Sequence, residues 1–125
     1  MSLKISGENF QIISSDSVQI YRYLDIGSCK PSLKERETVR HYLVDIVDPD
    51  FKFTAGDFCR EAEAACGEIF KEKRLPLFVG GCAFYVNAFF QGLSDIPPVT
   101  GQVREQLKDE LKIHGLTPLY EELKS

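Results

Sequence analysis

The sequence predicts an α/β protein built around a small parallel sheet. Three runs rich in apolar and β-branched residues, at 10–14, 41–47 and 75–79, have the length of strands. Helical patterns separate and follow these runs, and strands that alternate with helices favour a parallel sheet. The runs do not alternate strictly between apolar and polar residues, which is typical of strands covered on both faces.

The first third of the chain is predicted to hold a strand, a short helix and a loop. The strand at residues 10–14 ends in a cluster of serines and one aspartate. Residues 17–24 are expected to form one or two turns of helix, with Asp16 or Ser15 as the cap. Residues 26–40 are predicted to be a loop followed by a charged helical piece.

The middle third holds the clearest helix. Residues 41–47 predict a strand that ends at the turn-forming residues 48–50. Residues 55–73 repeat apolar side chains at helical spacing. Thr54 and Asp57 are expected to form a capping box, which would place the start of this helix directly after Thr54.

The last third is predicted to pass from the core to a more exposed helical segment. Residues 75–79 form an apolar strand, and residues 82–93 a helix that is apolar almost all round and is therefore expected to be buried. Residues 94–101 contain two adjacent prolines and predict a linker. One further helix is expected to end at His114, and Thr117 is the predicted cap of another.

Length, charge and cysteine spacing exclude several classes of protein. The 125 residues suit one domain with a modest core, and the net charge of -4 gives the chain no general attraction for nucleic acid. The chain has no apolar run of about 20 residues, as a membrane span requires, and no signal-peptide pattern. We therefore expect a cytoplasmic protein with no membrane partner. The four cysteines lack C-x-x-C spacing, so free thiols are expected rather than a zinc site.

Asp16 is the first candidate for chemistry. It follows an apolar strand, and ligands of α/β proteins bind beyond the carboxyl ends of strands. A carboxylate in this position can take a proton from a reacting group. The alternative is a purely structural role as the cap of the segment that follows.

The glycine pair Gly80-Gly81 is the second candidate. Two glycines after a buried strand let backbone N–H groups approach an anionic ligand closely. The alternative is a tight turn in which glycine serves packing alone. Cys82 would begin the following helix, where the pKa of a thiol tends to fall.

Basic residues form a third candidate group between positions 22 and 40. The members are Arg22, Lys30, Lys34, Arg36 and Arg40. Acidic residues are interleaved with them, so a solvated charged face and a phosphate-contacting surface both fit the pattern. The two histidines have no metal-ligand spacing.

Four separated blocks together are more specific than any single residue. The blocks are DSVQIYRYLDIGSCKP from residue 16, HYLVDIVDPDFKFTAGDF from residue 41, LPLFVGG from residue 75 and GLSDIPP from residue 92. In order and spacing, from about Ile13 to Pro98, the chain resembles the tRNA dimethylallyltransferases, also called tRNA isopentenyltransferases or IPP transferases.

The resemblance implies a nucleotide-binding, P-loop NTPase-like fold with a parallel sheet flanked by helices. It implies transfer of a dimethylallyl group from dimethylallyl diphosphate to N6 of adenosine 37, next to the tRNA anticodon, assisted by Mg²⁺. The expected partners are tRNA and dimethylallyl diphosphate. Residues 1–98 would be a partial catalytic core, and residues 99–125 the beginning of a helical tRNA-binding insertion.

The resemblance also assigns roles to residues. Asp16 matches the general base, and the run Asp16, Ser17, Val18 and Gln19 matches the segment that contacts the target adenosine. The residues expected near the diphosphate or the tRNA backbone are Arg22, Lys30, Gly80 and Gly81. Cys82 stands where the family has a threonine whose hydroxyl is expected at the reacting centre, and a thiol is a weaker donor.

The second departure from the family pattern is the phosphate-binding loop. The 125 residues hold no G-x-x-x-x-G-K-[ST] motif, and the main ligands for Mg²⁺ are therefore expected outside this chain. We expect a fragment that lacks the first strand of the sheet and has little or no activity alone. Unpaired sheet edges are expected to favour self-association.

Two other classes of function stay open. The chain could be a degenerate, non-catalytic member that binds RNA or a protein, which the two departures favour and the intact Asp16 to Gln19 block opposes. It could also be a fragment of an unrelated P-loop-like nucleotide kinase, although such a protein would lack the blocks around residues 25–31 and 92–98.

Overall fold

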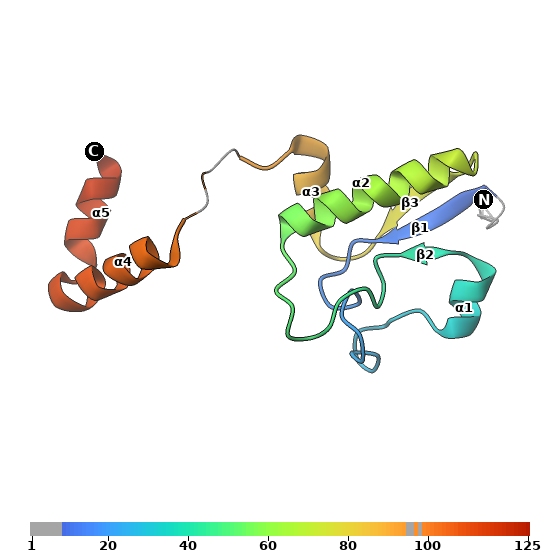
Figure 1. Cartoon of the computed structure of the whole chain (residues 1–125), viewed down its shortest axis with the longest axis horizontal. Helices are drawn as coiled ribbons and strands as arrows, with labels where there is room; N and C mark the ends of the chain where they lie inside the picture. The colour runs from blue at the N-terminus through green and yellow to red at the C-terminus, as the bar shows by residue number, and fades with distance from the viewer. Residues whose placement is uncertain (1–8, 95–96, 98) are drawn as a thin grey trace. The chain divides into compact units, whose positions relative to one another are not determined.

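The computed structural model describes residues 9–94, 97 and 99–125, and the chain divides into two units, Met1–Leu93 and Ser94–Ser125. The elements of the first unit are β1 (Phe10–Ser14), α1 (Leu33–Thr38), β2 (His41–Tyr42), α2 (Ala55–Lys71), β3 (Leu75–Val79) and α3 (Ala83–Gln91). The second unit holds α4 (Gly101–His114) and α5 (Leu116–Lys124) (Figure 1).

β1 is the middle strand of a parallel sheet with the order β2-β1-β3, which confirms the expected parallel sheet. Ile13 of β1 is paired with Tyr42 on one side and with Phe78 on the other. The core lies between this sheet and α2, where Ile13, Phe58 and Ile69 are fully buried. The carboxyl ends of all three strands therefore lie at the same edge of the sheet.

α2 begins at the predicted residue because its cap is encoded locally. The Thr54 hydroxyl accepts the N–H of Asp57 at 3.2 Å, and the Asp57 carboxylate accepts the N–H of Thr54 at 2.8 Å. This reciprocal pair confirms the predicted capping box. The helix ends at Lys71, two residues earlier than expected, and Lys73 then adopts a left-handed φ of 57°.

The helix predicted for residues 17–24 is absent, and turns take its place. The carbonyl of Ile20 accepts the N–H groups of Ile46 and Val47 at 2.9 and 3.2 Å, and Tyr21 forms an isolated bridge with Val47. At Ile20 and Tyr21, these long-range bonds take the place of helical hydrogen bonds. The prediction was wrong because a local pattern does not reveal this pairing.

The strand predicted for residues 41–47 is also shorter than expected. Only His41–Tyr42 forms β2, since Leu43 and Asp45 adopt left-handed φ angles of 61° and 58°. A strand cannot continue through such dihedral angles. The chain then reaches the start of α2 through a loop that contacts the turn after β1.

α3 is buried on one side only, so the prediction of a helix buried all round was wrong. Tyr85 and Ala88 are buried against α2, whereas Phe84 and Phe90 are 64% and 67% exposed. The described residues thus leave part of the apolar surface of this helix exposed.

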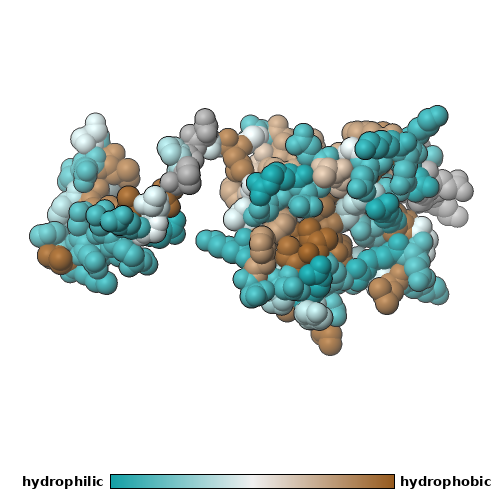
Figure 2. Space-filling view, in the orientation of Figure 1, coloured by the Kyte–Doolittle hydropathy of each residue, from teal (hydrophilic) through white to brown (hydrophobic). Residues whose placement is uncertain are grey.

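The sequence predicted a sheet covered on both faces, and this prediction was also wrong for the described residues. Leu75 and Val79 of β3 are 55% and 48% exposed. In the space-filling view of Figure 2, apolar side chains also gather beneath the N-terminal half of α2, surrounded by hydrophilic ones.

The second unit is a pair of helices in contact with each other. The Thr100 hydroxyl caps α4 by accepting the N–H of Val103 at 3.4 Å, and α4 ends at His114 as predicted. α5 begins at Leu116 with Gly115 as its N-cap, so the predicted cap at Thr117 was wrong by two residues. The two prolines of the predicted linker are Pro97 and Pro98, of which Pro98 lies outside the described residues.

No helix within the described ranges is long and apolar enough to cross a membrane. The cytoplasmic location stays a prediction. All four cysteines are free, as their spacing predicted.

Candidate active site

The loops that follow β1 and β3 meet at the carboxyl edge of the sheet. The N–H of Ser15 donates to the carbonyl of Val79 at 2.8 Å, and the carbonyl of Ser15 accepts the N–H of Cys82 at 3.0 Å. These two bonds extend the pairing of the strands into the loops. Asp16 is therefore held beside the start of α3, where ligands of parallel α/β sheets usually bind.

Gly80 makes this close approach possible. Its φ is 152°, and a Cβ built on it would lie 2.5 Å from the carbonyl carbon of Ser15. Any side chain at this position would push the two loops apart. Gly81 differs, since a Cβ there would meet nothing within 4 Å. Both glycines are exposed to solvent, but packing against Ser15 accounts for Gly80, whereas the open space beside Gly81 leaves its backbone accessible to a ligand.

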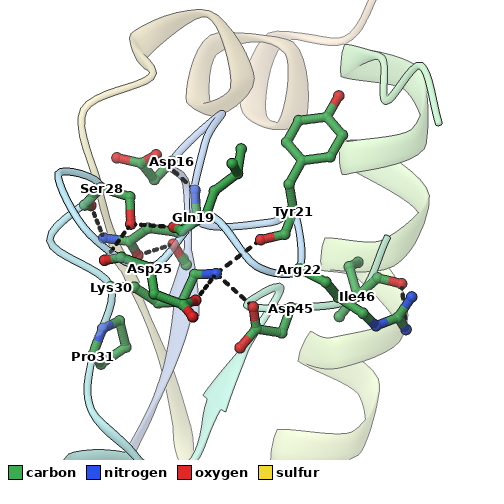
Figure 3. Close-up of polar contacts among 12 residues, drawn as sticks. Asp16, Gln19, Tyr21, Arg22, Asp25, Ser28, Lys30, Pro31, Asp45 and Ile46 are labelled. Atoms are coloured by element: carbon green, nitrogen blue, oxygen red, sulfur yellow. Dashed lines mark hydrogen bonds and ion pairs between the residues drawn. The ribbon is translucent and has the colours of Figure 1, made fainter. Parts of the chain in front are cut away.

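Asp16 both caps a turn and keeps an oxygen available. Its Oδ1 accepts the N–H groups of Val18 and Gln19 at 2.8 and 3.1 Å, and Figure 3 shows the carboxylate of Asp16 close to Gln19. Among the described residues, Oδ2 accepts no hydrogen bond. The side chain is half-buried, and the cap therefore orients the carboxylate without consuming it.

Gln19 uses its side-chain amide inside the protein. Its Nε2 donates to the carbonyls of Ser28 and Cys29, both at 3.1 Å, and its Oε1 accepts the Ser14 hydroxyl at 3.0 Å. Figure 3 shows this amide between the turn and the loop around Ser28. Both N–H donors of the amide are thus engaged, and Gln19 joins β1, the turn and the loop.

The basic residues singled out in the sequence mostly have acidic partners. Arg22 pairs with Asp48 at 3.0 Å and donates to the carbonyl of Ile46 at 3.1 Å. The side chain of Lys30 is only 3% exposed and faces into the protein. Arg22, by contrast, is 42% exposed and remains accessible from solvent.

The other two arginines of the group are also paired. Arg36 contacts Asp45 at 2.7 Å, and Arg40 contacts Glu68 and Glu72 at 3.3 and 3.5 Å. These pairs bring α1 and the segment before β2 against acidic residues elsewhere in the unit. The structure therefore does not gather the basic residues into one open, unpaired patch.

Cys82 is the N-cap of α3 rather than its first residue, and its side chain makes no capping hydrogen bond. Sequence reasoning did not select Tyr85, which lies one helical turn further on. Its ring stacks on Phe58 with centroids 4.7 Å apart. Burial raises the pKa of Tyr85, and the charges of Cys82, Tyr21, Asp57 and Asp16 raise it further. Tyr85 thus lies one helical turn from Cys82 near the start of α3, and this spacing in the sequence was the available signal.

A family model described as IPP transferase matches residues 19–125. The chain belongs to the IPP transferase family. The family resemblance expected from the four sequence blocks is therefore confirmed.

Curated relatives agree with this assignment. The chain is 40% identical to tRNA dimethylallyltransferase 1 of Syntrophotalea carbinolica over 124 residues, which cover 98% of this chain and 40% of the relative. It is 43% identical to the tRNA dimethylallyltransferase of Legionella pneumophila strain Corby over 91% of this chain and 36% of the relative. Both relatives are prenyl-transferring enzymes by name. The chain thus spans about two fifths of the length of the relatives it matches.

Solved structures show the same similarity in three dimensions. The full-length tRNA isopentenylpyrophosphate transferase of Bacillus halodurans matches with a TM-score of 0.65 and 35% identity, over 90% of this chain and 38% of that one. A eukaryotic dimethylallyltransferase described as acting on tRNA matches with a TM-score of 0.64 and 28% identity, over 74% of this chain and 24% of that one. The α/β arrangement described above is therefore that of IPP transferases.

The Mg²⁺ that the family resemblance implies is a hard cation that often binds through one or two carboxylates together with substrate phosphates. Within the described part of the chain, no group of three or more His, Cys, Asp or Glu side chains could hold a metal ion. A Mg²⁺ requirement stays a prediction, as does the expectation that its main ligands lie outside this chain.

Proposed function

We propose that this chain forms part of an enzyme that transfers a dimethylallyl group to N6 of adenosine 37 in tRNA. The observation that carries the proposal is the place of Asp16 in an IPP transferase. It sits at the carboxyl end of β1, beside the N-terminus of α3, with Oδ1 fixed by Val18 and Gln19. We further propose that the sheet belongs to the P-loop NTPase-like class, as its parallel order supports.

The proposed reaction forms one carbon–nitrogen bond and breaks one carbon–oxygen bond. N6 of the adenine attacks the terminal methylene carbon of dimethylallyl diphosphate, and diphosphate leaves with the electron pair of the broken bond. The nitrogen becomes cationic as the new bond forms. Oδ2 of Asp16 accepts one of its protons, so the carboxylate first stabilises the charge and then removes it.

The target adenine must leave its stack to reach this carboxylate. The residues Asp16, Ser17, Val18 and Gln19 are proposed to contact it, Ser17 and Val18 being exposed at the tip of the turn. The side-chain amide, backbone N–H and carbonyl of Gln19 are all engaged internally, so Gln19 is proposed to act on the base by shaping the turn that presents Ser17 and Val18.

The diphosphate and the tRNA backbone are proposed to lie along the same edge. Gly81 offers an open backbone at the turn into α3, and Arg22 is the accessible cation beside the turn. Cys82 would present its thiol where the family has a hydroxyl, as a weaker hydrogen-bond donor. Residues 99–125, whose described structure is helical, are proposed to belong to the tRNA-binding insertion.

The isolated 125-residue chain is proposed to transfer little or no dimethylallyl group. Its sequence holds no P-loop motif, so the diphosphate would lack its main donors. Prenylation of tRNA by the purified chain alone would contradict this part of the proposal.

The test of function places these residues in a full-length setting. The matching segment of a relative about 40% identical is replaced by this chain, and the chimaera is expressed in bacteria that lack their own enzyme. Mass spectrometry of digested tRNA then measures N6-dimethylallyl adenosine. We expect the chimaera to modify tRNA and Asp16→Asn to lower the rate at least about 100-fold. The exposed Asp50→Asn serves as the matched control and is expected to leave the rate unchanged.

Two results would contradict the proposed function. An Asp16→Asn chimaera as active as the parent would remove Asp16 from the chemistry. A folded chimaera that binds tRNA in a salt-dependent way but never modifies it would favour the degenerate RNA-binding alternative.

A further inference from the structure

Lys30 carries a buried charge close to the turn that follows Asp16. Its side chain is 3% exposed, and Nζ lies 2.8 Å from the carbonyl oxygen of Tyr21, 2.8 Å from Asp25 Oδ1 and 2.6 Å from Asp45 Oδ1. Figure 3 shows the ammonium group between these three acceptors. An ammonium has three N–H donors, so each has a partner inside the protein.

The charge of Lys30 is stable in this setting. Burial alone would lower the pKa of Lys30, but its hydrogen bonds and charge interactions with Asp25 and Asp45 raise it above the ordinary value. Burial on its own would likewise raise the pKa of Asp45, yet Lys30 and Arg36 lower it. Both groups are therefore charged at neutral pH, as a buried ion pair needs to be.

The three hydrogen-bond partners of Lys30 come from three different segments, and none of the three lies in a helix or a named strand. Tyr21 lies in the turn after Asp16, and Asp25 lies in the loop that contains Lys30 itself. Asp45 has the left-handed φ of 58° that ends β2, and its Oδ2 contacts Arg36 of α1 at 2.7 Å. A single ammonium group thus ties the turn, the loop and the segment before α2 together.

The loop that contains Lys30 also contacts the turn at residues 17–20, which follows Asp16. Ser28 and Cys29, the two residues before Lys30, offer the carbonyls that receive the Gln19 amide at 3.1 Å. The backbone N–H of Gln19 in turn donates to Asp16 Oδ1. The loop that the Lys30 side chain anchors therefore holds Gln19 through two hydrogen bonds, and Gln19 in turn holds the carboxylate.

We propose that Lys30 is a positioning residue that fixes the orientation of the Asp16 carboxylate, and that it is not a ligand for diphosphate or RNA. The proposal rests on the proposed function only for what Asp16 does once it is in place. The position of the turn can be measured in the chain alone, without substrate.

The experiment compares Lys30→Met with Lys34→Met by NMR of the full 125-residue chain. Lys34 is an exposed lysine on α1 and provides the matched control. One readout is amide hydrogen exchange at Asp45 and Ile46, whose N–H groups donate to Gln19 and Ile20. We expect exchange there to accelerate about tenfold or more in Lys30→Met, because hydrogen bonds to a charged group are lost. Exchange within α2 is expected to change less than about threefold.

The second readout follows the turn itself. The amide proton shifts of Val18 and Gln19 report the hydrogen bonds that these groups donate to Asp16 Oδ1, and they are expected to move upfield in Lys30→Met as those bonds weaken. Lys34→Met is expected to leave both readouts unchanged. Asp25→Asn removes only one of the two carboxylates that Lys30 contacts and is 67% exposed, so it is the milder variant should Lys30→Met fail to fold. It is expected to change the same amides in the same direction, by less.

Three outcomes would overturn the proposal. The first is a uniform change in hydrogen exchange across α2 and the turn in Lys30→Met, or in Asp25→Asn where that variant replaces it. Such a change would show that Lys30 contributes only to the overall stability of the fold. The second is no change at Val18 and Gln19. The third is an unchanged turn together with a decrease of about one in the slope of the logarithm of the tRNA-binding constant against the logarithm of the salt concentration. That result would make Lys30 a phosphate ligand. Absence of tRNA binding in the full-length chimaera described above would count against the proposed function, while the two NMR readouts would still decide the role of Lys30.

Discussion

At the scale of single residues, the two adjacent glycines do different work. Gly80 is pressed against Ser15 with a φ of 152°, whereas Gly81 has open space around it. From the sequence alone the two glycines were treated as one pair, because a diglycine turn does not reveal which of them packs against a neighbouring loop. The distinction separates packing from ligand approach at the site.

This difference predicts unequal effects of alanine. Gly80→Ala is expected to lower the free energy of unfolding by about 2–4 kcal/mol, since the methyl group would overlap Ser15 and the backbone would be strained. Gly81→Ala is expected to change it by less than about 0.5 kcal/mol. Urea denaturation of both variants measures the effect. Equal losses in the two variants would show that the close approach of the loops is not what Gly80 provides.

Asp16 was selected from the sequence, whereas Tyr85 was not. The position of Asp16 after a strand was visible in the sequence, and the structure places it at the carboxyl end of β1. Its hydrogen bonds to Val18 and Gln19 agree with the capping role, while its catalytic role stays a prediction. Tyr85 was overlooked because an aromatic residue on an apolar helix resembles ordinary core.

At the scale of elements, local signals predicted those parts of the fold that local forces determine. β1, β3 and α2 lie where composition, periodicity and the Thr54–Asp57 capping box placed them. Residues 17–24 and 43–47 were mispredicted because they pair with each other and are joined through Lys30. Contacts between segments about 25 residues apart leave no periodic trace in either segment.

The capping box of α2 predicts a dependence of stability on pH. Hydrogen bonds from the Thr54 hydroxyl and backbone N–H lower the pKa of Asp57 below its ordinary value of 3.8, and Arg60 lowers it further. Because the folded pKa is the lower one, this contribution to stability is complete above pH 3.8 and is lost as the pH falls through the folded pKa. Asp57→Asn is expected to remove that part of the acid dependence.

The measurement is the free energy of unfolding from pH 7 to pH 2 for the parent and Asp57→Asn. Asp50→Asn is the control, since Asp50 lies in a turn and has no capping role. The difference between the parent and Asp57→Asn should be constant near neutral pH and should narrow in acid. A difference that stays constant down to pH 2 would mean that the charge of Asp57 does not support the cap.

At the scale of the whole molecule, the described residues leave β3 at the edge of the sheet. Leu75 donates its N–H to the carbonyl of Asn9 at 2.9 Å, so this residue faces β1. Backbone direction alternates along a strand, which turns the nitrogen of Pro76 and the N–H of Phe78 away from β1. Pro76 carries no N–H and therefore weakens the outer edge as a template for another strand.

The exposed edge and the apolar residues near it predict weak self-association. Leu75 and Val79 of β3 and Phe90 of α3 are about half exposed or more. Pro76→Thr is expected to increase association several-fold by restoring an outward N–H, and Leu75→Lys is expected to reduce it by placing a charge on the edge. Leu33→Lys, on α1 and 73% exposed in the parent, is the control for a charge placed elsewhere.

Sedimentation velocity over a range of protein concentrations measures these differences. If association depends on strand pairing at β3, the order of association is Pro76→Thr, then the parent together with Leu33→Lys, then Leu75→Lys. If it depends only on general apolar surface, the two lysine variants will be alike and Pro76→Thr will match the parent. A parent chain that stays monomeric at all concentrations, together with a monomeric Pro76→Thr, would show that the edge does not recruit a partner strand, and Pro76 would then be only one of the features that protect it.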